Sequence, residues 1–99
     1  MENIILKINK SFENRIRLGI MSILIVNDKI DFKTLKNTLQ TSDGNIASHT
    51  TALEKEGYIQ ITKRFIGKKP NTSYSATQKG KKAFKEHLDA LEKIINGSL

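Results

Sequence analysis

Apolar residues recur at helical spacing in four segments of the chain, and the first segment covers residues 11–26. Phe12, Ile16 and Ile20 follow one another at intervals of four, which is the spacing of one helix face. Further apolar residues lie on other sides of the same segment, so this helix is expected to be buried between two partners. Ser11 is its expected N-cap.

The second and third helical segments are separated by a very short connection. Residues 32–39 are expected to follow a cap at Asp31, and the next helix covers residues 42–57. About four residues join the two helices, so the helices must cross steeply. This is a helix-turn-helix arrangement, with the second helix presented outward.

The helix at residues 42–57 has an apolar face and a polar face. Ser42 can cap its N-terminus, and Gly57 can end it in the left-handed conformation. Its inward stripe is expected to be Ile46, Thr50 and Leu53. The opposite side is small, polar and mildly basic, and consists of Gly44, Asn45, Ser48, Thr51, Ala52 and Lys55.

The pattern changes to alternation with a period of two after Gly57. Residues 58–63 are predicted to form a strand, and residues 72–76 a second strand. The connection between them is rich in turn residues. Pro70 is expected to exclude a ladder at its own position, so the tip of the hairpin should protrude. The whole hairpin, residues 58–76, is called the wing.

Residues 78–96 are predicted to form the last helix, capped by Thr77. Its apolar stripe is long for a small domain, so we expect it to pair with a second copy of the chain. The alternative is that the helix at residues 11–26 and the N-terminal isoleucines cover this stripe. Residues 3–10 fit a helical turn or a short strand equally well. The predicted dimer interface contains Ile4, Ile5, Ile8, Phe12, Phe84, Leu88, Leu91 and Ile95.

Composition adds that the chain is basic and free of cysteine. Its 99 residues predict one domain, residues 1–99 with a core at about 11–77, and its formal charge is +7. The window from Tyr58 to Lys85 contains no Asp or Glu. This charge favours a polyanionic partner, although a lysine-rich run can also be a solvated face. The lack of cysteine fits a reducing cytoplasm. No apolar run approaches the roughly 20 residues of a membrane span, and the start is not expected to be a secretory signal.

Two groups of residues are candidates for contact with DNA. A helix with short polar side chains can enter the major groove and reach base edges. The candidates on the helix are Ser42, Asn45, Ser48, His49, Thr51 and Lys55. His49 lies at the border of the core and is as suited to bracing the helix as to reading a base. The candidates on the wing, expected to bind phosphate, are Lys63, Arg64, Lys68 and Lys69. The lysines of the last helix can either extend this track or keep the helix soluble.

The sequence gives no sign of catalysis or of a bound cofactor. His49 and His87 lack companions at the spacing of a metal site. There is no nucleophile with a neighbouring base, no phosphate-binding glycine loop and no pair of carboxylates. We therefore expect neither an enzyme nor a metalloprotein.

The order of helix, helix, turn, helix, basic hairpin and helix resembles the winged helix-turn-helix transcription regulators of the MarR/ArsR-like type. The similarity is strongest to the small stand-alone regulators of archaea and bacteria. The segments that carry it are residues 12–21, 41–49, 53–59, 68–72 and 77–80. Thr50 departs from this pattern, since relatives carry a larger aliphatic residue there, and its hydroxyl can bond to the Ile46 carbonyl. The lack of cysteine removes the metal-sensing sites of the ArsR branch.

The resemblance implies a mainly α-helical fold with a β-hairpin wing that forms a homodimer through its terminal helices. It implies a regulator, most commonly a repressor, that binds a pseudo-palindromic operator in double-stranded DNA. The segment Ser42 to Lys55 would lie in the major groove, and the wing would contact the minor groove or nearby phosphates. A small-molecule effector, if one exists, would bind between the dimer helices and the DNA-binding part. A protein–protein adaptor and an RNA-binding module are the alternatives.

Overall fold

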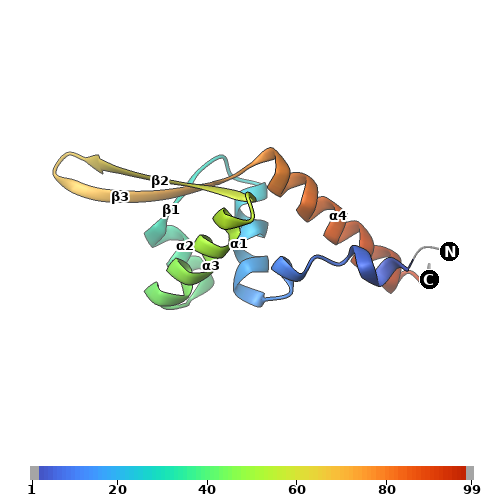
Figure 1. The fold of residues 1–99 in the computed structure, drawn as a ribbon. Helices are drawn as coiled ribbons and strands as arrows, with labels where there is room; N and C mark the ends of the chain where they lie inside the picture. Colours follow the sequence, from blue (N-terminus) through green and yellow to red (C-terminus); the bar gives the residue numbers. More distant parts are fainter. Residues whose placement is uncertain (1–2, 98–99) are drawn as a thin grey trace.

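The computed structural model describes residues 3–97, and it contains the predicted helices and hairpin in the predicted order. Met1, Glu2, Ser98 and Leu99, which the predicted domain included, lie outside the described residues. No helix within residues 3–97 is long and apolar enough to cross a membrane. The elements, shown in Figure 1, are the 3-10 helices η1 (Ile4–Lys7) and η2 (Lys10–Phe12), the helices α1 (Arg15–Ile25), α2 (Phe32–Leu39), α3 (Asp43–Lys55) and α4 (Gln78–Ile95), and the strands β1 (Ile30–Asp31), β2 (Ile59–Ile66) and β3 (Lys69–Ala76).

Helix α1 starts later than predicted, because the side chain of Asn14 caps it. The Asn14 side-chain oxygen accepts hydrogen bonds from the backbone N–H groups of Ile16 and Arg17. The expected cap, Ser11, lies instead inside the short helix η2. An asparagine satisfies the free N–H groups of a first turn as well as a serine does, so the pattern of apolar residues could not choose between them.

Helices α2 and α3 form the predicted helix-turn-helix, and both predicted caps are confirmed. The Asp31 carboxylate accepts from the Thr34 N–H at 2.8 Å, and Ser42 Oγ accepts from the Asn45 N–H at 3.1 Å. The turn itself is made by Gln40, which takes a left-handed conformation with a φ of 50°. This conformation is uncommon for a residue with a side chain, so no pattern in the sequence marked it.

The strands form one antiparallel sheet in the order β1-β3-β2. Gly67 and Lys68 form the two-residue turn of the hairpin, between the paired residues Ile66 and Lys69. Gly67 has a φ of 64°, and Lys68 does not share the positive φ, which is the pattern of a type II′ turn. Strand β1 adds a short third strand by pairing Ile30 with Tyr74.

The prediction that Pro70 excludes strand pairing was wrong. Strand β3 starts at Lys69, and Pro70 lies opposite Phe65. Successive residues of an antiparallel strand direct their backbone groups to opposite sides. In a hairpin with a two-residue turn the closing pair, here Ile66 and Lys69, is hydrogen-bonded, so Lys69 directs its groups toward β2 and the next residue, Pro70, directs its missing N–H to the outer side. Strand β1 ends before it reaches this position, so the sheet needs no hydrogen bond from Pro70.

The core lies where the base of the hairpin meets the helices. Fully buried apolar side chains from α1, α2 and α3 meet Ile59 and Tyr74 of the sheet. An aromatic cluster extends this core toward α4. The Phe12 ring lies 5.2 Å from both the Tyr58 and Phe84 rings, and 5.4 Å from the His87 ring. Aromatic pairs at these separations stabilise a core beyond their buried area.

Helix α4 packs on the rest of the chain through a face that shares only Phe84 with the apolar stripe predicted to pair with a second copy. The buried residues are Gly80, Phe84, His87 and Ala90. Leu88 is 44% exposed and Ile95 is 80% exposed. A glycine, an alanine and a histidine do not count in an apolar pattern, and they nevertheless form the inner face. Phe12 and Phe84, which we predicted at a dimer interface, are buried in the core of the single chain and leave that set.

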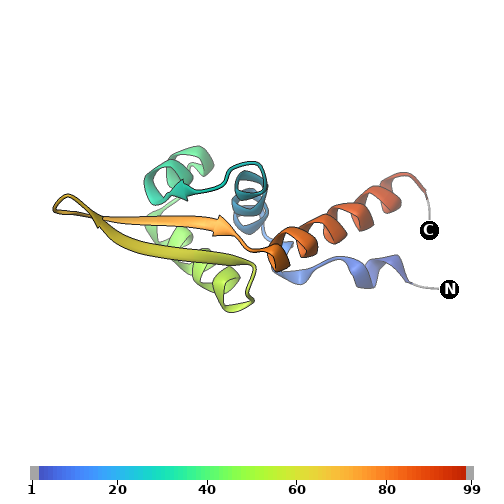
Figure 2. The same cartoon turned by 90° about the horizontal axis from the view of Figure 1, so that it is seen from above.

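The molecule is elongated, with extents of 57, 25 and 21 Å. The hairpin projects beyond α2 and α3 at one end, and α4 projects at the opposite end with the N-terminal segment beside it (Figures 1 and 2). This N-terminal segment, left open between a helical turn and a strand, contains η1 and packs against α4. The candidate DNA-contacting residues and the candidate dimer residues therefore lie at opposite ends.

Candidate nucleic-acid interface

Helix α3 is held by its inward stripe and leaves a small polar face exposed. Ile46, Thr50 and Leu53 are buried, as predicted. The Thr50 hydroxyl donates to the Ile46 carbonyl at 2.6 Å, which confirms the predicted bond and satisfies a buried polar group. The exposed residues of the helix are Asp43, Gly44, Asn45, Ala47, Ser48, Thr51, Glu54 and Lys55.

Two of the candidate contact residues at the start of α3 are already engaged within the chain. Ser42 Oγ accepts the Asn45 N–H as the helix cap. The Asn45 side-chain amide donates to Thr41 Oγ1 at 2.8 Å. This bond uses one of the two N–H groups of the Asn45 amide and leaves its oxygen and second N–H for a base, while the exposed Ser48 and Thr51 have no intramolecular side-chain hydrogen bond.

His49 is braced by an arginine that the sequence did not nominate. Arg17, on α1, donates from its Nε to His49 Nδ1 at 3.0 Å. Since Nδ1 accepts this bond, the ring proton of neutral His49 is on Nε2, which is then a fixed donor. Burial lowers the pKa of His49, and the positive charge of Arg17 lowers it further. His49 is therefore a neutral donor at the border of the exposed face.

All four of the nominated wing cations are exposed, together with two apolar side chains at the tip. Lys63, Arg64, Lys68 and Lys69 are exposed along the hairpin. Phe65 is 73% exposed and Ile66 57% exposed. The tip is therefore both basic and apolar, which the prediction of phosphate contacts alone did not cover.

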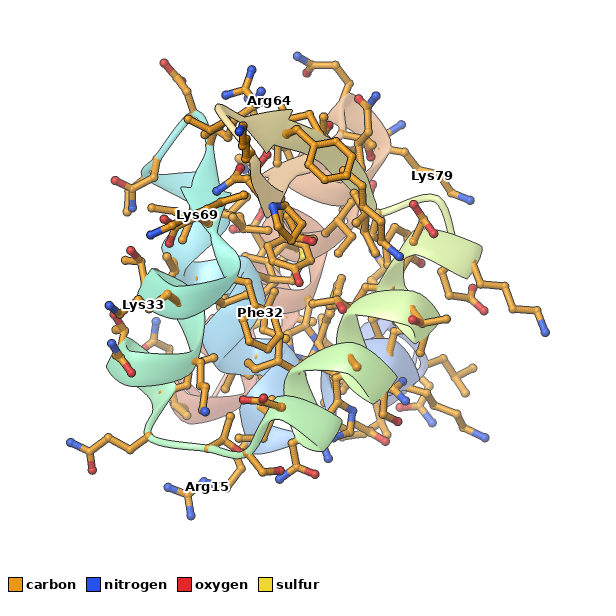
Figure 3. All side chains as sticks on the ribbon, turned by 90° about the vertical axis from the view of Figure 1, so that its left-hand side faces the viewer. Arg15, Phe32, Lys33, Arg64, Lys69 and Lys79 are labelled. Atoms are coloured by element: carbon orange, nitrogen blue, oxygen red, sulfur yellow. The ribbon has the colours of Figure 1, made fainter. Side chains whose placement is uncertain are left out.

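Other basic residues lie on the outline of the molecule when it is viewed from the end that carries the hairpin. Figure 3 looks at this end and shows Arg15, Lys33, Arg64, Lys69 and Lys79 around the periphery, with Phe32 near the centre. Arg15 and Lys33 are exposed and were not nominated from the sequence, because they lie outside both the third helix and the wing.

Two of the lysines of α4, which were left open between two roles, have distinct partners within the chain. Lys79 Nζ donates to the Glu56 carbonyl at 2.8 Å and lies 5.4 Å from the centre of the Tyr58 ring. It therefore holds the C-terminus of α3, where the helix dipole favours a cation. Lys85 pairs with Asp89 at 3.0 Å along the same helix.

The end of α3 is tied to the start of α4 by direct backbone contacts. The Thr77 hydroxyl donates to the Gly57 carbonyl at 2.6 Å, and the Thr77 N–H donates to the Tyr58 carbonyl at 3.0 Å. Gly80 packs so closely on Tyr58 that a side chain would not fit. Any displacement of α4 must therefore act on the exposed helix.

The N-terminal segment joins the same junction through Asn9. Its backbone N–H donates to His87 Nδ1, and its side-chain amide donates to the Tyr58 hydroxyl, both at 3.0 Å. Burial lowers the pKa of His87, against a smaller opposing effect of Glu13. His87 is thus a neutral acceptor inside the fold and serves packing, and it lies apart from His49.

A helix-turn-helix with an outward polar helix, followed by a basic antiparallel hairpin, is the architecture of a winged-helix DNA-binding module. Residues 16–95 match the winged helix DNA-binding domain family, and the chain belongs to this family. The protein is a winged-helix transcription regulator that binds DNA. Regulators of this family are typically not enzymes.

Other proteins are similar to this chain over most of its length. An uncharacterized protein of Methanocaldococcus jannaschii is 32% identical over 79 residues, which cover 80% of this chain and 86% of that protein. The structure of a transcriptional regulator homologue from Pyrococcus horikoshii OT3 is 32% identical, with a TM-score of 0.82 over 88% of this chain and 86% of the other. NadR, solved in complex with 4-hydroxyphenylacetate, shares the fold at 19% identity, with a TM-score of 0.72 over 95% of this chain and 66% of its own.

Proposed function

We propose that the protein is a homodimeric repressor that binds a pseudo-palindromic operator, with α3 of each protomer in the major groove. The observation that carries this proposal is the exposed face of α3, where Ser48 and Thr51 present short hydrogen-bonding side chains. His49 adds a fixed N–H donor beside them. Lys55 and the cations of the wing supply phosphate contacts on either side.

The dimer forms through the end of the molecule that lies away from the wing. Four large apolar side chains among residues 3–97 are exposed there, namely Ile5, Leu6, Leu88 and Ile95. Two copies bring eight such side chains together. Complete burial of each would contribute about 2 kcal/mol, but part of each side chain is already buried in the single chain, so the gain on association is roughly 10 kcal/mol. Association costs an estimated 4 to 15 kcal/mol, so the dimer is expected to depend on concentration. Ile4, Ile8 and Leu91 of the predicted interface are partly buried beside these side chains.

Sedimentation at several concentrations tests this interface. Leu88→Glu combined with Ile95→Glu places charges on exposed positions and should give a folded monomer. Val26→Glu is the matched control, because Val26 is 78% exposed on another part of the surface and should leave the dimer unchanged. A dimer that persists in the double variant shows that another surface mediates association.

Repression is the proposed outcome, since two protomers on one operator are enough to exclude another protein from the same DNA.

A groove of about 460 Å³ lies between the N-terminal segment and α4, with Ile4, Ile8, Glu86, Asp89 and Lys93 among its lining residues. Its size is in the range of small-molecule sites. We propose that an effector, if the protein has one, binds here, next to the dimer contacts.

A charge placed on the exposed face of α3 tests the function itself. Ser48→Glu and Thr51→Glu should each abolish binding to a selected operator, because a carboxylate meets the negative potential of the groove. Ser22→Glu, at an exposed position of α1, is the control and should bind normally. If either α3 variant binds the operator as the wild type does, α3 is not the reading helix. Binding of wild type to all sequences alike would favour an adaptor, and a preference for RNA would favour an RNA-binding module.

A further inference from the structure

The wing tip exposes apolar surface that the phosphate contacts of the proposed function do not need. Phe65 is 73% exposed and Ile66 57% exposed. Strand β2 is buried at its start, at Ile59, and its last four residues, from Lys63 to Ile66, are all exposed. Two large apolar side chains, one on each face of the hairpin, are thus exposed at its tip, where they can contact a partner.

Geometry makes this tip narrow and places Phe65 on a defined face of it. Phe65 lies opposite Pro70, and the alternation along β2 puts it on the face that carries Ile59 and Ile61 at the base. Ile66 lies on the other face, opposite Lys69. The exposed part of the strand is about 13 Å long at the usual rise per residue. Figure 1 shows the hairpin projecting past α2 and α3.

Charge indicates what the tip enters. Lys63, Arg64, Lys68 and Lys69 surround the apolar pair, and no acidic residue lies between Tyr58 and Lys85. A duplex offers an anionic backbone around an apolar stack of bases, and proteins that enter the minor groove insert apolar wedges between base steps. An anionic membrane is also charged outside and apolar inside. The polar exposed face of α3, which belongs to the same end of the molecule, favours DNA.

We propose that Phe65 is an apolar wedge that enters the minor groove beside the half-site read by α3, partly unstacks one base step and bends the duplex. This inference rests on the proposed function and adds a deformation of the DNA to it. Pyrimidine–purine steps unstack most easily. The operator is therefore expected to carry such a step under each wing tip, at a position where no side chain needs to read a base.

The test uses the full chain and a selected operator that carries a donor and an acceptor dye at its two ends. A 2-aminopurine replaces the adenine of the step under the wing tip. Wild type should shorten the distance between the dyes and raise the 2-aminopurine fluorescence. Phe65→Ala should lose both signals and bind at least about fivefold more weakly, as expected when a stacked aromatic side chain is removed. Ile66→Ala, also exposed at the tip but on the other face, should keep both signals.

The inference is overturned if wild type binds the operator selectively while the duplex stays straight and the 2-aminopurine stays quenched. It is also overturned if Phe65→Ala bends the DNA normally, or if Ile66→Ala loses the signals equally. In each of these cases the proposed function stands. Absence of any selective binding by wild type would remove the proposed function as well. Binding to vesicles of phosphatidylserine that depends on Phe65, without DNA bending, would assign the tip to a membrane instead.

Discussion

Replacing Gly80 with alanine tests the junction on which the position of α3 depends. Gly80 lies in the first turn of α4 and is buried against Tyr58. A Cβ at this position would lie 2.0 Å from the Tyr58 carbonyl oxygen and 2.8 Å from its carbonyl carbon. Carbon–oxygen contacts normally begin at about 3.3 Å, so α4 must move by about 1 Å. No change of rotamer can relieve the clash, because both atoms belong to the backbone.

One stabilising effect and two destabilising effects decide how much the free energy of unfolding changes. Alanine is the better helix former by about 1 kcal/mol, which alone would stabilise the variant. Overpacking costs typically 1 to 3 kcal/mol and occasionally more. The shift also stretches the bond from the Thr77 N–H to the same carbonyl, which contributes about 1 kcal/mol. We therefore expect a net loss of about 2 kcal/mol, or a fall in Tm of roughly 8 to 16 °C for a domain of this size.

Thermal and urea unfolding at one fixed protein concentration measure this loss. Gly44→Ala is the matched control, because Gly44 lies on the exposed side of α3 with its nearest neighbour, Ser42 Oγ, at 4.0 Å. This control should be as stable as wild type or more stable by up to about 1 kcal/mol. If Gly80→Ala is as stable as Gly44→Ala, then α4 does not pack on the end of α3 as described.

Three further predictions concern charge and protonation. Lys68→Ala combined with Lys69→Ala should weaken binding to all duplexes. The slope of log K against log salt should become shallower by about 0.9 for each phosphate that the wing tip no longer neutralises. An unchanged slope would show that the wing tip does not bind the DNA backbone. The free energy of unfolding should fall as the pH drops below about 6.5, because His49 and His87 have lowered pKa values in the folded state and the unfolded chain takes up protons first. His87→Gln should reduce this pH dependence in urea unfolding, and an unchanged dependence would contradict the assignment. Arg17→Met should raise the pKa of His49 in an NMR titration and weaken operator binding by up to about tenfold, while no change in that pKa would show that the two side chains do not interact.

The sequence was sufficient to predict the order of elements and most of the helix boundaries. Asp31, Ser42 and Thr77 were identified as caps, and all three accept the expected backbone hydrogen bonds. These are local interactions, so a short window of sequence contains the information that they need. The inward stripe of α3 was equally local, since three apolar or β-branched residues at helical spacing define it.

Apart from the local choice of Asn14 rather than Ser11 as the cap of α1, the errors arose where distant parts of the chain meet. The apolar spacing of α4 placed Phe84 with Leu88 in the predicted dimer interface, although Phe84 packs against Phe12 in the core. His87, which the apolar pattern did not include, is buried and accepts the Asn9 N–H. The role of Arg17 depends on its hydrogen bond with His49 across 32 positions, which no motif marks. Strand β3 can include Pro70 because the side of the strand that lacks a hydrogen-bond donor there has no neighbouring strand. Tertiary contacts decided each of these outcomes.

The most direct test of the account is selection of bound duplexes from a random pool by the purified protein. We predict enrichment of two half-sites related by inverted symmetry, with centres about one helical turn, or a multiple of it, apart. The Ser48→Glu variant, selected in parallel, should enrich no such site. A pool that stays random after selection by wild type, or the same site enriched by both proteins, would contradict the claim that α3 reads the DNA.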